Sequence, residues 1–167
     1  ISQRGFRVAP MSLAELADIY DARAHLEAMI LGLAIARGDD AWEAQIVASA
    51  HRLAKVLEVK DGEEMLNLWD ARHQAFHAAI AAGCGSQHLL QVRAALFDQA
   101  ERYRHLWLQQ TVFSPAALEA KRQEHATLVE VILQRDSARA CAMMQAHLLS
   151  PVSIIGELLQ ARQNRVE

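Results

Sequence analysis

Two histidines, His73 and His77, stand four residues apart in the segment W-D-A-R-H-Q-A-F-H. No proline or glycine interrupts the chain from residue 63 to residue 82, so a helix is predicted there. In a helix, side chains four residues apart lie one turn apart on the same face. Two imidazole nitrogens at that spacing can bind one metal ion. The spacing alone is also compatible with a histidine pair that binds no metal, because many helices carry such a pair.

Two further histidines, His125 and His147, are expected to face inward from later helices. Together with the first pair they would complete a site of three or four nitrogens, which suits Zn²⁺, with Ni²⁺ or Mn²⁺ as other candidates. Taken singly, each is more typical of a core histidine that is hydrogen-bonded to a neighbour. The remaining histidines project toward polar helix faces and are expected at the surface: His25, His51, His88 and His105.

Charged side chains fall inside the apolar faces of two predicted helices. Arg23 and Glu27 lie within the apolar stripe of the first helix, and Arg104 lies at the edge of a later stripe that contains Tyr103. A guanidinium directed at a core requires a carboxylate, either from the protein or from a ligand. Arg23 and Glu27 could instead form an ion pair with each other, and Arg104 could extend to the surface.

The elements that must position these groups are all predicted to be helices. The chain has 167 residues, of which 52% are hydrophobic, and it contains only 7 glycines and 3 prolines. This composition favours helices over strands, and the length suits one domain. We predict an all-α fold, an antiparallel bundle of six or seven helices around a central metal site. The predicted helices span residues 13–37, 41–59, 63–82, 87–110, 115–134 and 137–149, with a last one beginning at residue 152.

Several classes of function are disfavoured. The net charge of −3 argues against DNA binding by this piece alone. No uninterrupted apolar run approaches the roughly 18–20 residues of a membrane span, and there is no signal peptide. Two cysteines make no disulfide framework, which favours a cytoplasmic protein. No H-E-x-x-H, G-x-S-x-G, phosphate-binding glycine loop or E-x-x-H pair is present, so the chain is predicted not to be an enzyme.

The order and spacing of several short segments resemble the effector-binding (FCD) domain of FadR-subfamily GntR transcription regulators. A narrower resemblance, to glutarate-responsive repressors of that subfamily, is carried by W-D-A-R-H-Q-A-F-H, A-G-C-G-S and E-R-Y-R-H-L-W-L. The segments that carry the wider resemblance are G-F-R-V-A-P-M-S at 5–12, D-I-Y-D-A-R-A-H-L-E at 18–27, A-F-H-A-A-I at 75–80, L-L-Q-V-R-A-A-L at 89–96, E-H-A-T-L at 124–128 and R-D-S-A-R-A at 135–140, followed by H-L at 147–148.

The resemblance implies a helical bundle around a divalent metal, with a ligand set of an Asp-x-x-x-His pair and two later histidines. On this chain the pair falls on His73 and His77, and the later two on His125 and His147. The sequence departs from the pattern, because His73 stands where the family usually has aspartate. Asp70 is expected to support His73 from outside the metal by accepting an imidazole N–H.

The resemblance also implies a small dicarboxylate effector, similar to glutarate. One carboxylate would bind the metal, and the other would lie near Arg23 or Arg104, with a further hydrogen bond from Tyr103. Glu27 would contact and orient these ligand-binding groups without touching the ligand itself. The leading alternative is a metal-dependent helical-bundle enzyme that acts on a small carboxylate with Glu27 as its base, and a second alternative is a purely structural oligomerisation domain.

The resemblance divides the chain at residue 12. Residues 1–11 are expected to be the end of a winged helix-turn-helix domain and its linker, and residues 12–162 to be the FCD domain. The DNA-binding half would precede Ile1, so operator DNA is expected to be a partner only through that missing domain. The family also implies a homodimer.

Overall fold

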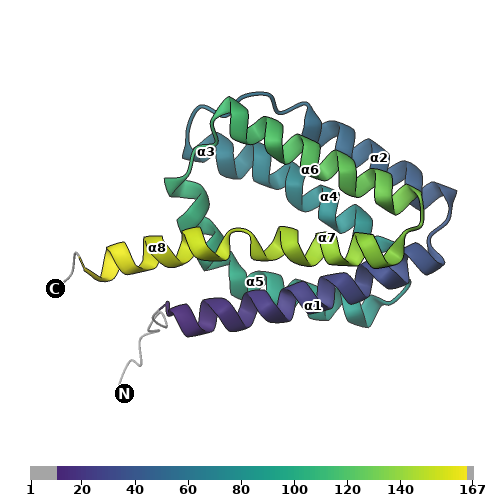
Figure 1. Ribbon diagram of the computed structural model, residues 1–167, viewed down its shortest axis with the longest axis horizontal. Helices are drawn as coiled ribbons and strands as arrows, with labels where there is room; N and C mark the ends of the chain where they lie inside the picture. The colour runs from purple at the N-terminus through teal and green to yellow at the C-terminus, as the bar shows by residue number, and fades with distance from the viewer. Residues whose placement is uncertain (1–10, 165–167) are drawn as a thin grey trace, which may run out of the picture.

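The computed structural model describes residues 11–164, apart from the side chains of residues 110 and 163, and every regular element in this range is a helix (Figure 1). The predicted all-α fold is confirmed. The domain end and linker expected over residues 1–11 lie almost entirely outside the described part. The elements are α1 (Leu13–Arg37), α2 (Asp40–Ala54), α3 (Gly62–Glu64), η1 (Met65–Asp70), α4 (Ala71–Ala82), α5 (Gln87–Gln110), α6 (Pro115–Leu133), α7 (Ser137–Leu149) and α8 (Val152–Gln163).

The helices begin where the sequence supplies capping side chains. The hydroxyl of Ser12 accepts a hydrogen bond from the backbone N–H of Glu15 at 3.1 Å. Ser114 caps α6 in the same way, and Pro115 occupies the first turn of that helix, as expected. Such caps satisfy backbone donors that have no partner inside the helix, so they fix where each element starts.

The second predicted helix was too long. It was expected to run to residue 59, but α2 ends at Ala54. Val56 and Val59, in the loop that follows, are both buried in the core. Burial of these two apolar side chains by an extended loop outweighs the helix propensity that the sequence pattern had indicated.

The predicted helix over residues 63–82 contains a π-helical insertion that the sequence pattern did not reveal. One turn of α-helix, α3, leads into the π-helix η1, and α4 continues from it. A π turn accommodates an extra residue, and such turns occur frequently at functional sites. Here η1 buries Met65, Trp69 and Asp70 immediately before the helix that carries His73.

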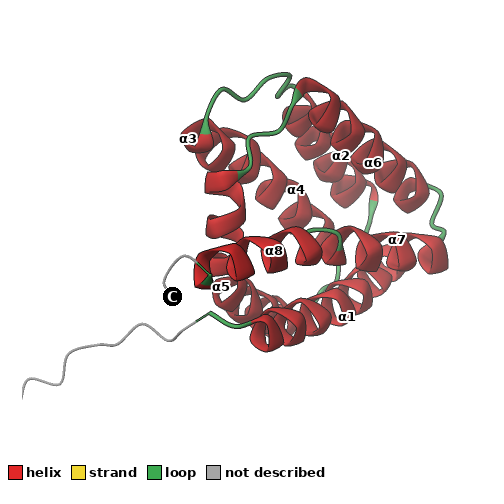
Figure 2. Cartoon of the chain, turned by 60° about the vertical axis from the view of Figure 1, so that its left-hand side comes forward, coloured by secondary structure: helices red, strands yellow, loops and turns green. Residues whose placement is uncertain are grey.

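The bundle consists of two groups of helices that face each other. Figures 1 and 2 show α2, α4 and α6 on one side and α1, α5 and α7 on the other, with α8 following α7. Helix α1 packs along α7 and also contacts α5, α4 and α8, whereas α2 packs against α4 and α6. Side chains from α4, α6 and α7 can therefore meet in the interior.

Trp42 fixes α2 against α4. Its indole N–H points at the backbone carbonyls of Ala79 and Ile80, 3.1 and 3.0 Å away. A Cβ at Gly83 would lie 2.6 Å from the indole, and one at Gly38 would lie 2.1 Å from it. Only glycine allows the tryptophan to approach so closely, so these residues set the position of the helix that carries two of the histidines.

One stretch of the described chain, Ser137–Arg162, is long and apolar enough to span a membrane by length and composition, with a hydropathy of 1.2. It comprises α7 and α8, which are separated by a turn at residues 150–151. A single stretch of this kind is weak evidence for a membrane span, because the core helices of soluble proteins can have the same length and composition.

Candidate metal centre and adjoining cavity

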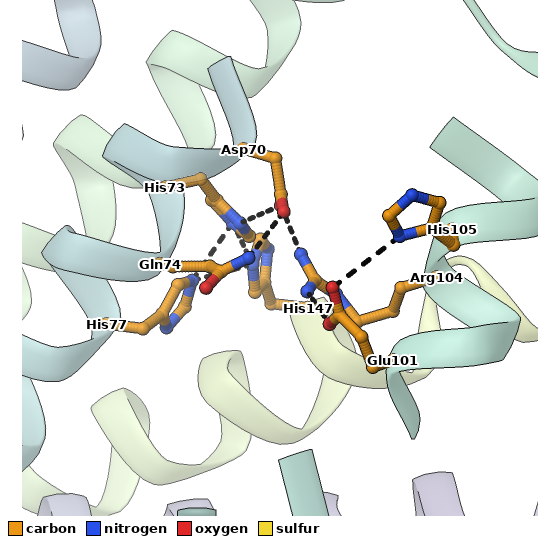
Figure 3. A network of polar contacts seen from close by, with 8 residues as sticks. All are labelled: Asp70, His73, Gln74, His77, Glu101, Arg104, His105 and His147. Carbon is orange, nitrogen blue, oxygen red and sulfur yellow. Dashed lines mark hydrogen bonds and ion pairs between the residues drawn. The ribbon is translucent and has the colours of Figure 1, made fainter. Parts of the chain in front are cut away.

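Four histidines from three helices converge in the interior. His73 and His77 come from α4, His125 from α6 and His147 from α7, and one ring nitrogen of each lies within 4.8 Å of the others. The Nε2 atoms of His73, His77 and His147 form a triangle with sides of 3.1, 3.1 and 3.2 Å. Figure 3 shows these three rings pointing toward one another. The structure therefore brings together all four histidines proposed from the sequence.

Burial disfavours protons on three of the four rings, and a carboxylate orients the fourth. Nδ1 of His147 lies 2.8 Å from Glu124 Oε1, so Nδ1 donates to this carboxylate and Nε2 is the nitrogen that faces the cluster. Nε2 of His125 is buried and has no hydrogen-bond partner in the described structure. Burial, reinforced by the charge of His147, lowers the pKa of His125 to about 3. Burial also holds the pKa values of His73 and His77 well below the usual range.

Neutral imidazoles that aim lone pairs at a common centre repel one another unless a cation lies between them. Metal–nitrogen bonds of about 2.1 Å place neighbouring ligand nitrogens roughly 3.0–3.4 Å apart, for angles between octahedral and tetrahedral. The observed separations of 3.1–3.2 Å fall within this range. The cluster could therefore hold a divalent ion, and a set of imidazole ligands favours zinc or nickel over magnesium or calcium.

The expected support of His73 by Asp70 is not formed. Nδ1 of His73 lies 3.9 Å from Asp70 Oδ1, which is too long for a hydrogen bond. Asp70 instead accepts hydrogen bonds from Arg104 and, at 2.5 Å, from Gln74 (Figure 3). His73 is oriented by stacking on Trp69, with ring centroids 4.6 Å apart.

Glu124 is the carboxylate that orients a metal-site histidine, and the sequence analysis gave it no role. Burial opposes its ionisation, but the hydrogen bonds and charges of His147 and Lys121 outweigh burial and lower its pKa to about 2. An ionised Glu124 fixes the tautomer and the orientation of His147. Because Glu124 and His147 lie on different helices, no projection of a single helix could have paired them.

We expect Glu124→Gln to weaken metal binding about 10- to 100-fold, because the amide is a poorer acceptor for the imidazole N–H. Competition with a chromophoric chelator measures the affinity. Glu119→Gln is the matched control, since Glu119 lies on the same helix and contacts Arg122 and Gln123 instead of a histidine. Equal metal affinities in the two variants would show that Glu124 does not act on the site.

A cavity of about 410 Å³ adjoins the histidine cluster. Its wall includes His73, His77 and His147, so a molecule in the cavity can reach the metal centre. The remaining wall is contributed mainly by α1, η1, α4 and α5. It includes Tyr20, Arg23, Arg93, Phe97 and Arg104. The volume is within the usual range of small-molecule sites.

Two of the three arginines in this wall are paired with buried carboxylates. Arg104 contacts Asp70, and Nε of Arg93 lies 2.8 Å from Glu27 Oε1. The alternative of an Arg23–Glu27 ion pair is therefore wrong, because Glu27 is bound to an arginine 66 residues away.

Arg23 has no ion-pair partner among the described residues. It lies over the rings of Tyr20 and Phe97, with Cζ–centroid distances of 5.3 and 5.4 Å. Burial lowers its pKa from the usual value. A buried guanidinium without a carboxylate could bind an anionic ligand.

Tyr103 lies apart from the cavity wall. Its hydroxyl accepts a hydrogen bond from the N–H of Ser12 at 3.1 Å and contacts Glu15, so it fastens the start of α1 to α5. The expected role of Tyr103 in ligand binding has no support in this geometry. The tyrosine in the cavity wall is Tyr20, which was not among the ligand-binding residues expected from the sequence.

Comparison with known proteins identifies the family. Residues 18–150 match the FCD domain family, and this range contains the four histidines and Arg23. The chain belongs to the FCD domain family. The likeness of this FCD domain to a solved GntR-family transcriptional regulator from Pseudomonas syringae pv. tomato str. DC3000 has a TM-score of 0.69 at 20% identity. That match covers 96% of this chain and 64% of the solved chain, and it supports the fold.

Curated relatives of this FCD domain are transcription regulators. The chain is 54% identical over 159 residues to the HTH-type transcriptional repressor GlaR of Escherichia coli (strain K12), covering 95% of this chain and 72% of GlaR. It is 33% identical over 156 residues to the uncharacterized HTH-type transcriptional regulator BphR of Paraburkholderia xenovorans (strain LB400), covering 92% of this chain and 62% of BphR. The chain thus spans about two thirds of the length of these relatives, and by its family and its relatives it belongs with transcription regulators and not with enzymes.

Proposed function

We propose that this FCD domain is a metal-dependent sensor of a small dicarboxylate. His77, His125, His147 and His73 hold one divalent ion, which is Zn²⁺ in our proposal, with Ni²⁺ and Mn²⁺ as alternatives. When bound, the ion supplies a Lewis-acidic point to which a carboxylate oxygen of the effector attaches. Arg23 binds the second carboxylate. Two anchors at a fixed separation select the acid by chain length, and a glutarate-like C5 acid is the preferred ligand.

The observation that carries this proposal is the position of the unpaired Arg23 in the wall of the same cavity as the histidine cluster. Arg104 also lines that cavity, but Asp70 neutralises it. Arg23 is therefore the guanidinium that needs an anion, and the histidine nitrogens need a cation. A dicarboxylate bound to a divalent ion satisfies both requirements.

We propose that effector binding to this domain changes how the rest of the regulator binds DNA. The ligand would contact α1, α4 and α5, which come from distant parts of the chain, and would stabilise one arrangement of them. In a homodimer, that arrangement would bias the spacing of the two DNA-binding domains that precede residue 12. Such a regulator acts on operator DNA in the cytoplasm.

Elemental analysis of the purified protein, followed by a thermal-shift screen of C4, C5 and C6 diacids, tests the proposal. We expect about one equivalent of a divalent transition metal per chain. The C5 diacid should raise the melting temperature most, because a ligand that binds only the folded state stabilises it. The proposal would be contradicted if the purified protein contained no bound metal and none of the three diacids changed its melting temperature.

The alternative of a metal-dependent enzyme requires a general base in the cavity. Glu27, the inward candidate, is already engaged in an ion pair with Arg93. Incubation of the metal-loaded protein with the C5 diacid, followed by NMR, distinguishes the two functions. A sensor returns the ligand unchanged, whereas an enzyme converts it.

A further inference from the structure

Tyr20 and Arg23 are two buried polar side chains on adjacent turns of α1 that lack polar partners. Tyr20 is 2% exposed, and its hydroxyl has no hydrogen-bond partner among the described residues. Arg23 is 6% exposed and forms no ion pair with any described residue. Both side chains line the cavity beside the histidine cluster. A buried hydroxyl without a partner destabilises the folded protein, so the pair requires an explanation.

The charges around the cavity indicate the kind of group that would satisfy both side chains. Arg23, Arg93 and Arg104 line the wall, and the buried carboxylates Glu27 and Asp70 neutralise only the last two. Asp98 and Lys121 also line the cavity, so the decisive group is Arg23 itself, the guanidinium next to Tyr20 that has no ion-pair partner among the described residues. Burial raises the pKa of Tyr20, although Arg23 opposes the rise, so the hydroxyl keeps its proton and is a donor at neutral pH.

A carboxylate satisfies both residues, because its oxygens accept hydrogen bonds and its charge offsets that of Arg23. A guanidinium offers only donors, and a tyrosine hydroxyl beside it has its proton free to donate. A carboxylate accepts both, whereas a carboxamide would direct its own N–H₂ group at one of the donors. The unpaired charge of Arg23 thus favours an acid over its amide, which has nearly the same size.

We propose that Tyr20 is a specificity-determining residue of the sensor, whose hydroxyl donates a hydrogen bond to the same carboxylate that Arg23 binds. This inference rests on the proposed function, which supplies that carboxylate as the end of the dicarboxylate remote from the metal. We call Tyr20 and Arg23 together the carboxylate seat. A ligand carboxylate bound there would satisfy both polar groups, which explains why they are kept in the core of the ligand-free protein.

The test compares Tyr20→Phe with the unchanged protein, both metal-loaded, by isothermal titration calorimetry. The probes are glutarate, its monoamide glutaramate and the C5 monoacid pentanoate. We expect Tyr20→Phe to bind glutarate about 10- to 100-fold more weakly, because it lacks one hydrogen bond to a charged group. Its affinity for pentanoate should be unchanged, since pentanoate has no second carboxylate.

The melting temperature of ligand-free Tyr20→Phe is a second measurement. It should rise, whereas the affinity of this variant for glutarate should fall. Removal of an unsatisfied buried hydroxyl should raise the melting temperature by about 2–6 °C. Tyr103→Phe is the matched control, because the hydroxyl of Tyr103 is hydrogen-bonded to Ser12 and lies outside the cavity. That variant should melt at a lower temperature and bind glutarate as the unchanged protein does.

The outcomes separate the inference from the function on which it rests. If the unchanged protein binds none of the probes, the proposed function fails and the seat fails with it. If it binds glutarate but Tyr20→Phe binds equally tightly, only the seat is overturned. A variant that loses affinity for glutarate and pentanoate alike and melts at a lower temperature would assign Tyr20 a structural role, which also overturns the inference.

Discussion

His77→Ala is expected to lose the bound metal ion and to melt about 5–15 °C below the unchanged protein. Nε2 of His77 lies 3.1 Å from both His73 and His147, so it belongs to the centre of the cluster. Loss of a direct ligand should weaken metal binding by more than about 100-fold, since loss of an outer partner alone costs 10- to 100-fold. The shift in melting temperature follows from the loss of about 3–4 kcal/mol of binding-linked stability.

Elemental analysis and differential scanning calorimetry measure this prediction. His88→Ala is the control, because His88 is exposed on α5 and lies outside the cluster; its metal content and melting temperature should not change. After treatment with a chelator, the unchanged protein and His77→Ala should melt at more similar temperatures. Stoichiometric metal in purified His77→Ala would exclude the four-histidine site.

Arg23→Met is expected to keep its metal but to bind the C5 diacid at least about 100-fold more weakly. The variant removes the guanidinium that has no protein partner, and truncation of one member of a buried charge pair costs roughly 2–5 kcal/mol of binding. The ligand-free variant should be at least as stable as the unchanged protein, because a buried, unpaired charge is replaced by an apolar side chain of similar length.

Arg93→Met provides the contrast, because Arg93 lines the same cavity but is paired with Glu27. This variant should be less stable, by about 3–5 kcal/mol, since it leaves a buried carboxylate without its counter-charge. Calorimetric titration and thermal unfolding of both variants separate the two roles. Unchanged diacid affinity in Arg23→Met would refute the proposal that Arg23 binds the second carboxylate.

The convergence of the four histidines could be predicted because periodicity placed each of them on the inward side of its own helix and the family resemblance grouped them. His73 and His77 needed only one regular helix, and His125 and His147 needed only an inward direction. The π turn at Met65–Asp70 breaks the periodicity, but it ends before His73, so the spacing of the pair is preserved.

The contacts between side chains of different helices could not be predicted in the same way. Tyr103 faces inward, as its position on the helix indicated, but the length of α5 carries it to the beginning of α1 and away from the cavity. Glu27 also faces inward, yet its partner is Arg93, 66 residues away. Periodicity determines the face on which a residue lies, whereas the packing of helices determines which residue it meets.

Consecutive residues of α5 connect two distant parts of the molecule. Tyr103 bonds to Ser12, where the chain enters its first helix, and the adjacent Arg104 contacts Asp70 in the cavity wall. Because Tyr103 and Arg104 are neighbours on one helix, any rigid displacement of this part of α5 would move both contacts together. The beginning of α1 and one wall of the cavity are therefore anchored to the same turn of α5.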